Sequence, residues 1–386
     1  MITKKLLLLP LGTLAFFACS SESGEGNFSN NPKAEEVVES SSSVVESSSE
    51  QGETRKTIDY SKGQAMNAKI GHGINMGNTF DADCETCWGA GPIEEYQVKA
   101  IKDAGFNSIR LPVRWDRQAS KEAPYTIPET YLARVKEVVG WINGQGLIAI
   151  INMHHHQSFL TDTTAGARPV TENTEMHLTR VDSIWRQVAD YFATVSNDSL
   201  IFELFNEPRW AVTADIHNQM IARTYPIIRK SNPGRTLMYG SYTYNAYSGI
   251  RSLKLPEDGN IIYTPHYYVP ASYALQGEGG RCPESPNTWE GTSAEIKAMT
   301  EDFNKMVSLA NEYYPGGLPI NIGEFGATYC GGISSRVKWV KQFVKLAKEK
   351  GFSWNYWGFT KIGGYELFDK ETQTWSDTET LKALLE

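Results

Sequence analysis

The chain has 386 residues, of which 40% are hydrophobic and 21% are charged, a composition typical of globular proteins with a large core. Its formal net charge of −8 lacks the excess of Lys and Arg that a surface for nucleic acid or anionic lipid requires. We therefore expect no nucleic-acid partner and a neutral substrate. The chain also contains 10 Trp and 19 Tyr, which suits stacking against flat apolar faces such as those of sugars.

The N-terminus has the pattern of an export signal. Lys4 and Lys5 precede an apolar run over residues 6–17, which contains Pro10. This run is shorter than the ~20 residues that span a bilayer, so a secretory signal is favoured over a membrane anchor helix. We expect residues 1–19 to form this signal.

The end of the signal resembles a bacterial lipobox. Residues 16–18, Phe-Phe-Ala, lead into Cys19, although such boxes usually have Leu where Phe16 stands. The resemblance implies that Cys19 carries lipid, and that Ser20, in place of Asp, directs the protein to the outer membrane of a diderm bacterium. We expect an exported protein that is a lipoprotein of the outer membrane or cell surface, or that is secreted.

Residues 20–56 have the composition of a tether. They contain two serine runs, at residues 40–43 and 47–49, and acidic residues far outnumber basic ones. Such a segment cannot bury enough apolar surface to offset the entropy of ordering. We expect a disordered linker here, followed by one catalytic domain over residues 57–386.

From residue 57 onward, short runs rich in Val, Ile, Phe and Tyr alternate with longer segments of helical periodicity, as in repeated βα units. The eight expected strands are approximately Gly73–Met76, Ser108–Val113, Ile148–His154, Ile201–Asn206, Leu237–Gly240, Ile261–Tyr267, Ile320–Phe325 and Trp354–Phe359. The expected helices include Glu95–Ala104, Glu129–Asn143, Leu178–Val195, Ala214–Lys230, Ala294–Tyr313 and Ser334–Lys350. These units predict a (β/α)8 TIM barrel, an α/β fold. The alternative is an open doubly wound sheet, but no Gly-x-Gly-x-x-Gly follows any strand.

Two glutamates end expected strands of this barrel, where active sites of the fold lie. Glu207 closes the apolar run that starts at Leu200, and Glu324 follows the run of the seventh strand between Gly323 and Gly326. Strands four and seven face each other across a barrel, so the two carboxylates can flank one bond, as glycoside hydrolysis requires. A lone glutamate at either place would favour a helix cap or a salt bridge.

The chain from about residue 57 to the C-terminus resembles glycoside hydrolase family 5, the cellulase family. The motifs that carry the resemblance are LIFELFNEPR at 200–209, GEFG at 323–326, FNSIRLPV at 106–113 and GINMGN at 73–78. The resemblance implies a retaining (β/α)8 glycosidase with Glu207 as acid/base and Glu324 as nucleophile. It implies no metal and no organic cofactor.

The same resemblance assigns supporting residues. Arg110 would hold Glu324 ionised, and Asn206 would bind the 2-hydroxyl of the sugar at the cleavage point. His266 and Tyr268 match the family's His-x-Tyr, whose His lies near the acid/base and whose phenol contacts the nucleophile. The alternatives are a structural ion pair for Arg110 and an interior position for the others.

A further set of residues is expected to shape the sugar subsites. His154 and His155 match the family's His pair after Asn, Trp357 matches its aromatic platform, and Asn78 ends the first motif. The three adjacent His, His154 to His156, also suggest a metal, but neighbours on a strand point to opposite faces and no carboxylate of suitable spacing accompanies them. Other candidate platforms, against ordinary packing, are Trp88, Trp115, Trp210, Tyr242 and Trp289.

Four further cysteines lie in expected loops at one end of the barrel: Cys84, Cys87, Cys282 and Cys330. Export to an oxidising compartment favours disulfides, with Cys282–Cys330 as one pairing. The sequence leaves the connectivity open, and a four-Cys zinc site is the alternative.

These observations predict a monomeric endo-β-1,4-glucanase that cleaves cellulose-type β-glucans with retention of configuration. Mannanase, xyloglucanase, xylanase and mixed-linkage glucanase activities are alternatives on the same scaffold, as is a transglycosylase. An alternative of another class is a surface lipoprotein that binds glycans without cleaving them. The presence of both acids speaks against it, because a binding protein does not need that pair.

Overall fold

The computed structural model describes residues 56–161, 172–278, 280–360 and 363–386. The expected signal over residues 1–19, its Cys19 and nearly all of the linker over 20–56 lie outside the described residues. Within the described ranges, no helix combines the length and the apolar character needed to cross a bilayer.

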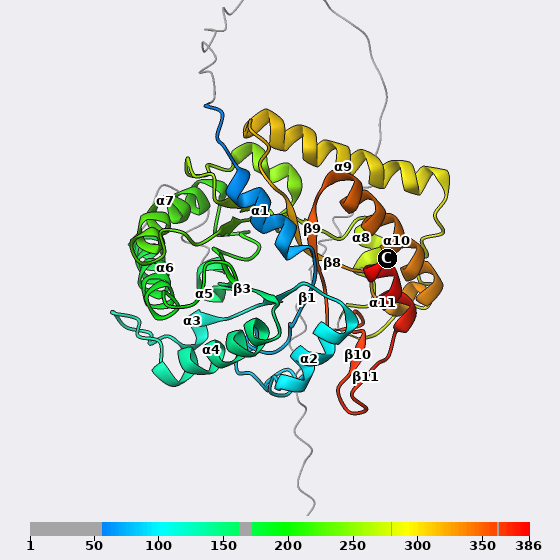
Figure 1. The fold of residues 1–386 in the computed structure, drawn as a ribbon, viewed down its shortest axis with the longest axis horizontal. Coiled ribbons are helices and arrows are strands. Elements are labelled where there is room, and N and C mark those ends of the chain that lie inside the picture. The colour runs from blue at the N-terminus through cyan, green and yellow to red at the C-terminus, as the bar shows by residue number, and fades with distance from the viewer. Residues whose placement is uncertain (1–55, 162–171, 279, 361–362) are drawn as a thin grey trace, which may run out of the picture. The chain divides into compact units, whose positions relative to one another are not determined.

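Parallel strands form the centre of the molecule (Figure 1). They are β1 (His72–Asn75), β2 (Ser108–Leu111), β3 (Ile148–Asn152), β4 (Leu200–Glu203), β5 (Leu237–Tyr239), β6 (Ile261–Tyr263), β7 (His266–Tyr267), β8 (Asn321–Phe325) and β9 (Ser353–Tyr356). Each lies within or beside one of the expected strands, so the predicted α/β barrel is confirmed.

The nine strand segments correspond to eight barrel strands, because β6 and β7 are two parts of the sixth. The sheet order is β6-β5-β4-β3-β2-β1-β9-β8-β7, so these two parts stand at its opposite ends. Tyr263, the last residue of β6, makes a parallel bridge to Ile320, and His266 of β7 pairs with Glu324 of β8. Strand six therefore joins β5 on one side and β8 on the other, which closes the barrel.

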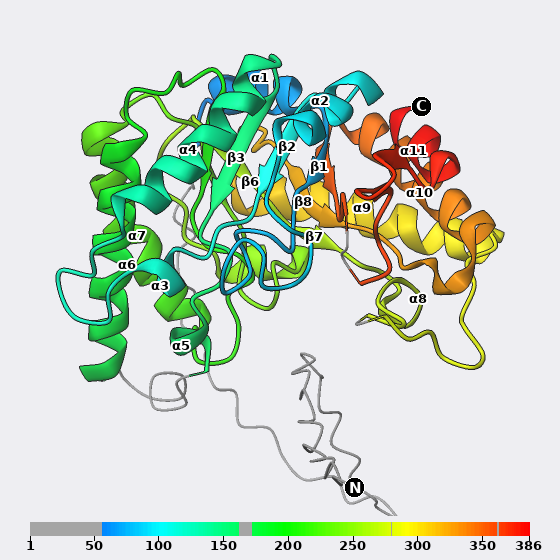
Figure 2. The same cartoon turned by 90° about the horizontal axis from the view of Figure 1, so that it is seen from below.

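Helices surround the barrel in both ribbon views (Figures 1 and 2). The longer ones are α1 (Ser61–Ile70), α2 (Glu95–Ala104), α4 (Glu129–Gly144), α6 (Glu172–Tyr191), α7 (Ala214–Ser231), α9 (Ser293–Tyr313), α10 (Ile333–Lys350) and α11 (Thr378–Leu385). Short elements occupy the loops: α3 (Trp115–Gln118), α5 (Gln157–Leu160), η1 (Tyr247–Ser252), α8 (Ala271–Ala274), η2 (Tyr329–Gly331), β10 (Phe368–Asp369) and β11 (Thr374–Trp375).

Local sequence accounts for several helix ends. At the start of α9, Thr292 and Glu295 form a reciprocal capping box that satisfies backbone N–H groups of the first turn. Helix α10 ends at Gly351, whose positive φ of 70° is a conformation that glycine adopts without strain. Most of the helices expected from periodicity lie within one or two residues of their observed bounds.

Helix α6 differs from its expected range of 178–195. Its first turn is mostly exposed and polar, so the apolar periodicity did not mark it. It ends four residues early because Arg235, which lies beyond α7, donates hydrogen bonds to the carbonyls of Phe192, Val195 and Ser196. These carbonyls are satisfied by a side chain rather than by another helical turn.

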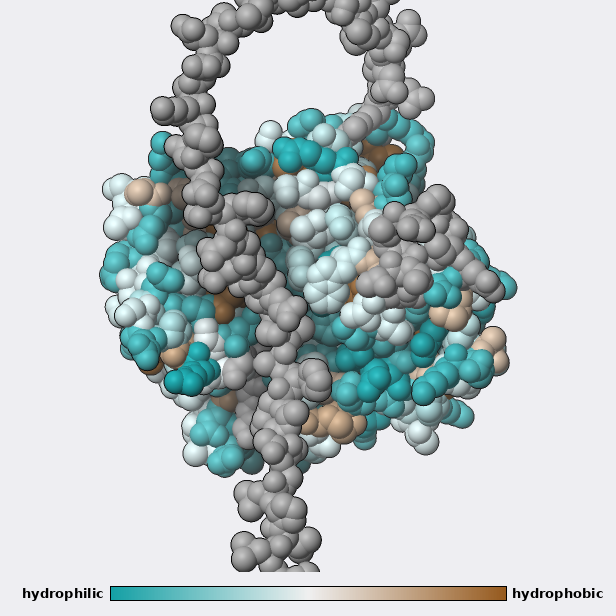
Figure 3. Space-filling model, turned by 180° about the vertical axis from the view of Figure 1, so that it is seen from behind, coloured by the Kyte–Doolittle hydropathy of each residue, from teal (hydrophilic) through white to brown (hydrophobic). Residues whose placement is uncertain are grey.

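The barrel interior has an apolar part, which α1 closes at the N-terminal ends of the strands. Met66 and Ile70 of α1 are buried against the inward-facing side chains of β3 to β6. These are Ile148, Ile150, Ile201, Met238 and Ile262. Figure 1 shows α1, in blue, lying across this end. The opposite face is mainly hydrophilic where its surface is coloured (Figure 3).

The interior between β1, β2, β8 and β9 is polar instead. Asn355 donates a hydrogen bond to the Ser108 hydroxyl, and Asn321 donates to the Ser353 hydroxyl and to Asn355 Oδ1. A Cβ at Gly73 would come within 2.2 Å of the Asn355 and Ser108 side chains, so only glycine leaves them room. The network satisfies its buried amides without a charge.

Buried neutral histidine makes the fold sensitive to acid. His217 of α7 is 1% exposed, and its two ring nitrogens have no hydrogen-bond partner among the described residues. Burial lowers the pKa of His217 to about 3. The unfolded chain, with a pKa near 6.5, therefore binds one more proton than the folded chain between these two values.

We predict that the free energy of unfolding falls as the pH falls from 6.5 towards 4, and that His217→Leu removes about 1.4 kcal/mol per pH unit of this slope. The measurement is urea unfolding at several pH values. Above pH 7 the two proteins should show the same dependence on pH, which serves as the internal control. An unchanged slope in the variant would contradict the prediction.

Candidate active site

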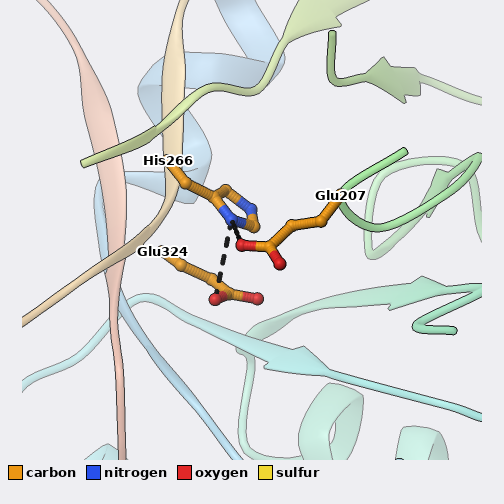
Figure 4. Close-up of side chains that lie close together, drawn as sticks. All are labelled: Glu207, His266 and Glu324. Atoms are coloured by element: carbon orange, nitrogen blue, oxygen red, sulfur yellow. Dashed lines mark hydrogen bonds and ion pairs between the residues drawn. The ribbon is translucent and has the colours of Figure 1, made fainter. Parts of the chain in front are cut away.

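The two glutamates expected to be catalytic lie together at the C-terminal ends of the strands, with His266 between them (Figure 4). His266 Nδ1 is 2.9 Å from Glu207 Oε1 and 3.6 Å from Glu324 Oε2. One oxygen of each carboxylate and a His266 nitrogen all lie within 4.8 Å of one another. Retaining glycosidases hold their carboxyl groups about 5–5.5 Å apart and inverting ones about 6.5–9.5 Å, so this spacing fits retention.

A β-bulge directs Glu324 into the mouth of the barrel. Ile322 and Phe325 both pack in the outer core although they are three residues apart, and the register of β8 with β9 shifts between them. One extra residue is therefore accommodated at Gly323–Glu324, which turns the Glu324 side chain inward. A Cβ at Gly323 would lie 2.4 Å from the Thr264 hydroxyl, so glycine permits the bulge.

Arg110 of β2 is the fixed positive charge of the site. Its guanidinium is fully buried and donates to Glu324 Oε1 at 2.7 Å and to Asn206 Oδ1 at 2.6 Å. It also donates to Asn75 Oδ1 at 2.9 Å and twice to Glu203, at 2.6 and 2.7 Å. All five N–H donors of the guanidinium are thus used. The expected contact between Arg110 and Glu324 is present.

Glu203 is a site residue that the sequence interpretation missed. It ends β4, is fully buried, and forms a bidentate ion pair with Arg110. Arg110 therefore faces two carboxylates and not one, and the three charges sum to −1. The available signal was an acid within an otherwise apolar strand, four residues before Glu207, which requires a buried cation as partner.

The pKa values of the two carboxyls shift in opposite directions. Burial tends to raise the pKa of Glu207, but the hydrogen bond and charge of His266, together with Arg209, outweigh burial and lower it. Burial raises the pKa of Glu324, helped by the charge of Glu207 and opposed by His266 and Arg110. The interactions with His266 therefore decide the direction of the shift at Glu207, against burial.

The cations beside the two carboxyls differ in kind. Arg110 is a guanidinium with donors only, whereas His266 is an imidazole whose second ring nitrogen, Nε2, contacts Asn245. When His266 is neutral, its charge no longer favours ionised Glu207, and Glu324 keeps its ion pair with Arg110.

The other residues expected near the carboxylates occupy the same site. The Tyr268 hydroxyl donates to Glu324 Oε2 at 3.1 Å, and burial next to these carboxylates raises its pKa. Asn206, which precedes Glu207 in the chain, is buried, and its Oδ1 accepts a hydrogen bond from Arg110. Its amide nitrogen is therefore not the atom that contacts Arg110. Both side chains are therefore positioned by the buried charges.

The three adjacent histidines do not form a metal site with one another. His154 lies 4.4 Å from His155 by ring centroids and stacks on Trp357 at 5.7 Å, whereas His156 packs against Phe159. Burial lowers the pKa of His155 to about 3 and of His156 to about 4. All three rings are therefore neutral near pH 7, and His154 with Trp357 forms one wall of the site.

Asn78 lies in the loop after β1 in a left-handed conformation, with φ of 59°. Its backbone N–H donates to Asp81 Oδ2 at 3.0 Å, and the N–H of Thr79 donates to Asp81 Oδ1 at 2.8 Å. Asp81 is buried, and burial raises its pKa to about 6. The loop that carries Asn78 is therefore shaped by a buried acid that the sequence interpretation did not single out.

Four of the five candidate aromatic platforms divide into a buried and an exposed pair, and the fifth, Tyr242, is partly buried. Trp115 and Trp289 are wrong as platforms, because they are 0% and 3% exposed and pack in the core. Trp88 and Trp210 are 47% and 48% exposed. Periodicity could not separate these cases, since both kinds of Trp follow strand ends.

An exposed aromatic group beside Glu207 includes one residue that was not expected. The Arg209 guanidinium lies 4.7 Å from the ring centroid of Trp210 and 4.9 Å from that of Tyr244. The two rings meet edge to face at 6.2 Å, and Tyr244 is 45% exposed. Arg209 also donates to the Glu207 carbonyl at 2.8 Å, so this aromatic surface is tied to the loop of Glu207.

Among the described residues, Glu207, His266 and Glu324 are the group with the spacing of metal ligands. The Arg110 guanidinium, 2.7 Å from Glu324, already compensates that carboxylate and would repel a metal ion. The arrangement therefore fits proton transfer and nucleophilic attack better than metal binding.

The four cysteines are paired in two disulfides. Cys84 bonds to Cys87, and Cys282 bonds to Cys330. The second disulfide links the loop that follows strand six with η2, which follows β8. A Cβ at Gly277 would come 2.4 Å from Cys330 Sγ, so glycine allows the loop to pack on this disulfide.

Comparison with known proteins identifies the family. A model of the cellulase family, glycosyl hydrolase family 5, matches residues 72–362. The chain belongs to glycosyl hydrolase family 5. The match runs from β1 past the loop that carries Trp357, so it includes every strand of the barrel.

Similar family members carry endoglucanase names. The chain is 32% identical to Endoglucanase H of Acetivibrio thermocellus over 323 residues, which cover 83% of this chain and 33% of that protein. The chain thus spans about a third of that relative's length. Two solved structures match with TM-scores of 0.76 and 0.74. One is a hyperthermophilic endo-β-1,4-glucanase in complex with substrate, 36% identical over 84% of this chain and 100% of that chain. The other is Thermotoga maritima Cel5A in complex with mannotriose, which is 29% identical over 83% of this chain and 99% of that chain.

We predict that Arg110→Lys lowers kcat by about 100-fold or more and destabilises the fold by about 3 kcal/mol. The reason is that the ammonium group of lysine cannot make the five hydrogen bonds by which the guanidinium binds four side chains. Initial rates on a soluble β-glucan and urea unfolding measure the two effects. Arg117→Lys, at a half-exposed ion pair with Asp83, is the matched control. It should change kcat by no more than about twofold and the free energy of unfolding by no more than about 0.5 kcal/mol. Normal turnover in Arg110→Lys would contradict this account of the site.

Proposed function

We propose that this protein is a retaining endo-β-1,4-glucanase that hydrolyses internal bonds of cellulose-type β-glucans. The observation that carries the proposal is the spacing of the Glu207 and Glu324 carboxylates, within 4.8 Å through one oxygen of each, in a barrel of the cellulase family. Endoglucanase names among the relatives support the glucan, but they describe those proteins and in part much longer chains.

The first step forms a covalent intermediate. A Glu324 oxygen attacks the anomeric carbon while the bond to the leaving oxygen breaks, and Glu207 gives its proton to that oxygen. Arg110 and Tyr268 hold Glu324 by ionic and hydrogen bonds, which keeps the attacking carboxylate ionised and oriented. We assign Asn206 to the 2-hydroxyl of the same sugar.

The second step releases the sugar. Glu207, now ionised, takes a proton from water, the water oxygen attacks the anomeric carbon, and the bond to Glu324 breaks. Two displacements at one carbon restore its configuration. Hydrolysis, rather than transfer to a second sugar, requires that water reach this intermediate.

We assign the substrate surface to residues around the cleavage point. The stacked His154 and Trp357 offer a flat wall beside the carboxylates, with His155 next to His154 and Asn78 in the loop after β1. The half-exposed Trp357 ring suits an apolar sugar face. No organic cofactor or metal enters this mechanism, and we propose that the enzyme acts as a monomer.

We predict that the enzyme cleaves mixed-linkage glucan and carboxymethylcellulose faster than glucomannan or xyloglucan, and that viscosity falls faster than reducing ends appear because internal bonds are cut. Proton NMR of the first products should show the β-anomer. Glu324→Gln and Glu207→Gln should each lower the rate about a thousandfold or more while retaining glucan binding.

Glucomannan is included because a similar structure holds mannotriose. Faster cleavage of glucomannan than of glucan would identify a mannanase and contradict the proposed substrate. Binding of glucan with negligible cleavage of all four polysaccharides would identify a glycan-binding protein. Longer products than the starting oligosaccharide would identify a transglycosylase.

We propose further that residues 57–386 are the catalytic domain and that a lipid on Cys19 anchors it to the outer membrane through a linker over residues 20–56. The support is the sequence pattern around Cys19 alone. The anchor would hold the enzyme at the cell surface, where its polymeric substrate is found.

We predict that a clickable fatty acid labels the full chain in a diderm host and that Cys19→Ser abolishes the label. Ser20→Asp is the matched variant, which should keep the label and move the protein from the outer to the inner membrane fraction. A label that persists in Cys19→Ser, or an unlabelled wild-type chain, would contradict the anchor.

A further inference from the structure

The loop over residues 241–246, which follows β5, holds both partners of the contact between His266 and Glu207. The N–H groups of Thr243 and Tyr244 donate to the carbonyl of Pro208, the residue after Glu207, at 2.9 and 3.3 Å. Asn245 accepts the backbone N–H of His266 at 3.0 Å. The loop thus connects the backbones beside these two side chains.

This loop has a costly backbone conformation. Thr243, Tyr244 and Asn245 all have positive φ, at 67°, 56° and 54°. Three consecutive residues other than glycine in the left-handed region cost free energy, and Thr is poorly suited to it. Such conformations are found where surrounding contacts impose them, often at active sites.

The Asn245 side chain contacts His266 as well. Its Nδ2 lies 3.2 Å from His266 Nε2, and Asn245 is fully buried. A Cβ at Gly240 would come within 2.4 Å of three side-chain atoms of Asn245, so the amide is closely confined. Asn245 therefore fixes His266 by both its backbone and its side chain.

The contact with Asn245 determines which His266 nitrogen carries the proton when the ring is neutral. An amide nitrogen only donates, so His266 Nε2 must accept and have no proton. The proton is then on Nδ1, which faces Glu207 Oε1 at 2.9 Å and Glu324 Oε2 at 3.6 Å.

We propose that Asn245 is a positioning residue that keeps the proton of neutral His266 on Nδ1, directed at the two catalytic carboxylates. The inference rests on the proposed function and adds a residue to it. With Nδ1–H donating to Glu207 Oε1, the acid proton of Glu207 resides on Oε2, from which it can pass to the leaving oxygen. With the proton on Nε2, the Nδ1 lone pair would instead accept the acid proton of Glu207 and hold it away from the substrate.

Several charged and titratable groups act on His266 from the elements around it. Glu207 approaches from the loop after β4 and Glu324 from β8, and His154 interacts with it electrostatically from the loop after β3. Arg209 and Arg110 lie behind the two carboxylates. Asn245 is the neutral partner among these groups, so its effect on His266 is the choice of tautomer rather than the addition of charge.

Reversing the Asn245 amide gives the opposite arrangement. Oδ1, which has no partner among the described residues, would then face Nε2 and require a proton there. That arrangement leaves the two amide N–H donors without the nitrogen acceptor, and an unpaired buried donor group is costly. The two arrangements place the His266 proton on different nitrogens, so they can be told apart by experiment.

The first experiment observes the tautomer directly. Nitrogen NMR of the full enzyme with 15N-labelled histidine, with the His266 signals assigned by their loss in His266→Gln, should show a protonated Nδ1 and an unprotonated Nε2 at pH 7 to 8. In Asn245→Gly, which the left-handed backbone accommodates, a substantial fraction should change to protonated Nε2. Protonated Nε2 in the wild type would overturn the proposal.

The second experiment uses kinetics. Asn245→Gly should lower kcat about tenfold with KM changed less than about twofold. Asn245→Asp keeps the shape and tolerates the backbone but accepts a proton from Nε2, which stabilises charged His266. That charge favours ionised Glu207, so the basic limb of the kcat/KM profile should move to lower pH by about one unit.

Thr243→Ala is the matched control in the same strained loop. The Thr243 side chain is exposed, and the hydrogen bonds of the His266 ring are made to Asn245 and Glu207, so the His266 tautomer, the kcat and the pH profile of this variant should equal those of the wild type. Wild-type profiles in both Asn245 variants, each verified as folded by thermal melting, would overturn the proposal. A wild-type enzyme without glucanase activity would refute the proposed function, and the NMR result would still test the role of Asn245.

Discussion

The site depends on a buried guanidinium that must satisfy two carboxylates at once. Arg110 binds Glu203 within β4 and Glu324 on β8, and through Asn75 it also reaches β1. Removing any one partner would leave a charge or an amide unpaired in a region without water access. The same contacts that hold Glu324 therefore tie together strands that are distant in the chain, so barrel closure and the position of Glu324 cannot be separated.

The two carboxylates have neighbours of different electrostatic character, and this difference assigns their roles. The Arg110 guanidinium donates to Glu324, whereas the His266 ring contacts Glu207. Their surroundings, rather than their equal intrinsic acidity, support the proposed roles of Glu324 as nucleophile and Glu207 as proton carrier. Asn245 acts on this arrangement indirectly, because it contacts the His266 ring and not the carboxyl of Glu207.

Much of the fold followed from the sequence, since buried parallel strands are continuous apolar runs and their ends were visible at Glu207 and Glu324. The residues that were missed have a common cause. Glu203 and Asn245 act through Arg110 and His266, which are distant in the chain, and a single sequence does not show which distant group meets a buried polar side chain. Likewise, the sequence left Trp115 open between a platform and ordinary packing, because local pattern does not reveal burial.

The bulge in β8 makes the chemistry depend on a residue count. Because strand side chains alternate between the two faces, a regular, unbulged pairing of the same residues with β9 would place Glu324 on the face of Ile322 and turn its carboxyl into the helical layer. Every amino acid needed for hydrolysis would still be present. Engineering this site into another barrel must therefore preserve the bulge as well as the residue types. A motif placed on a regular strand would direct its glutamate to the outer face, away from the active site.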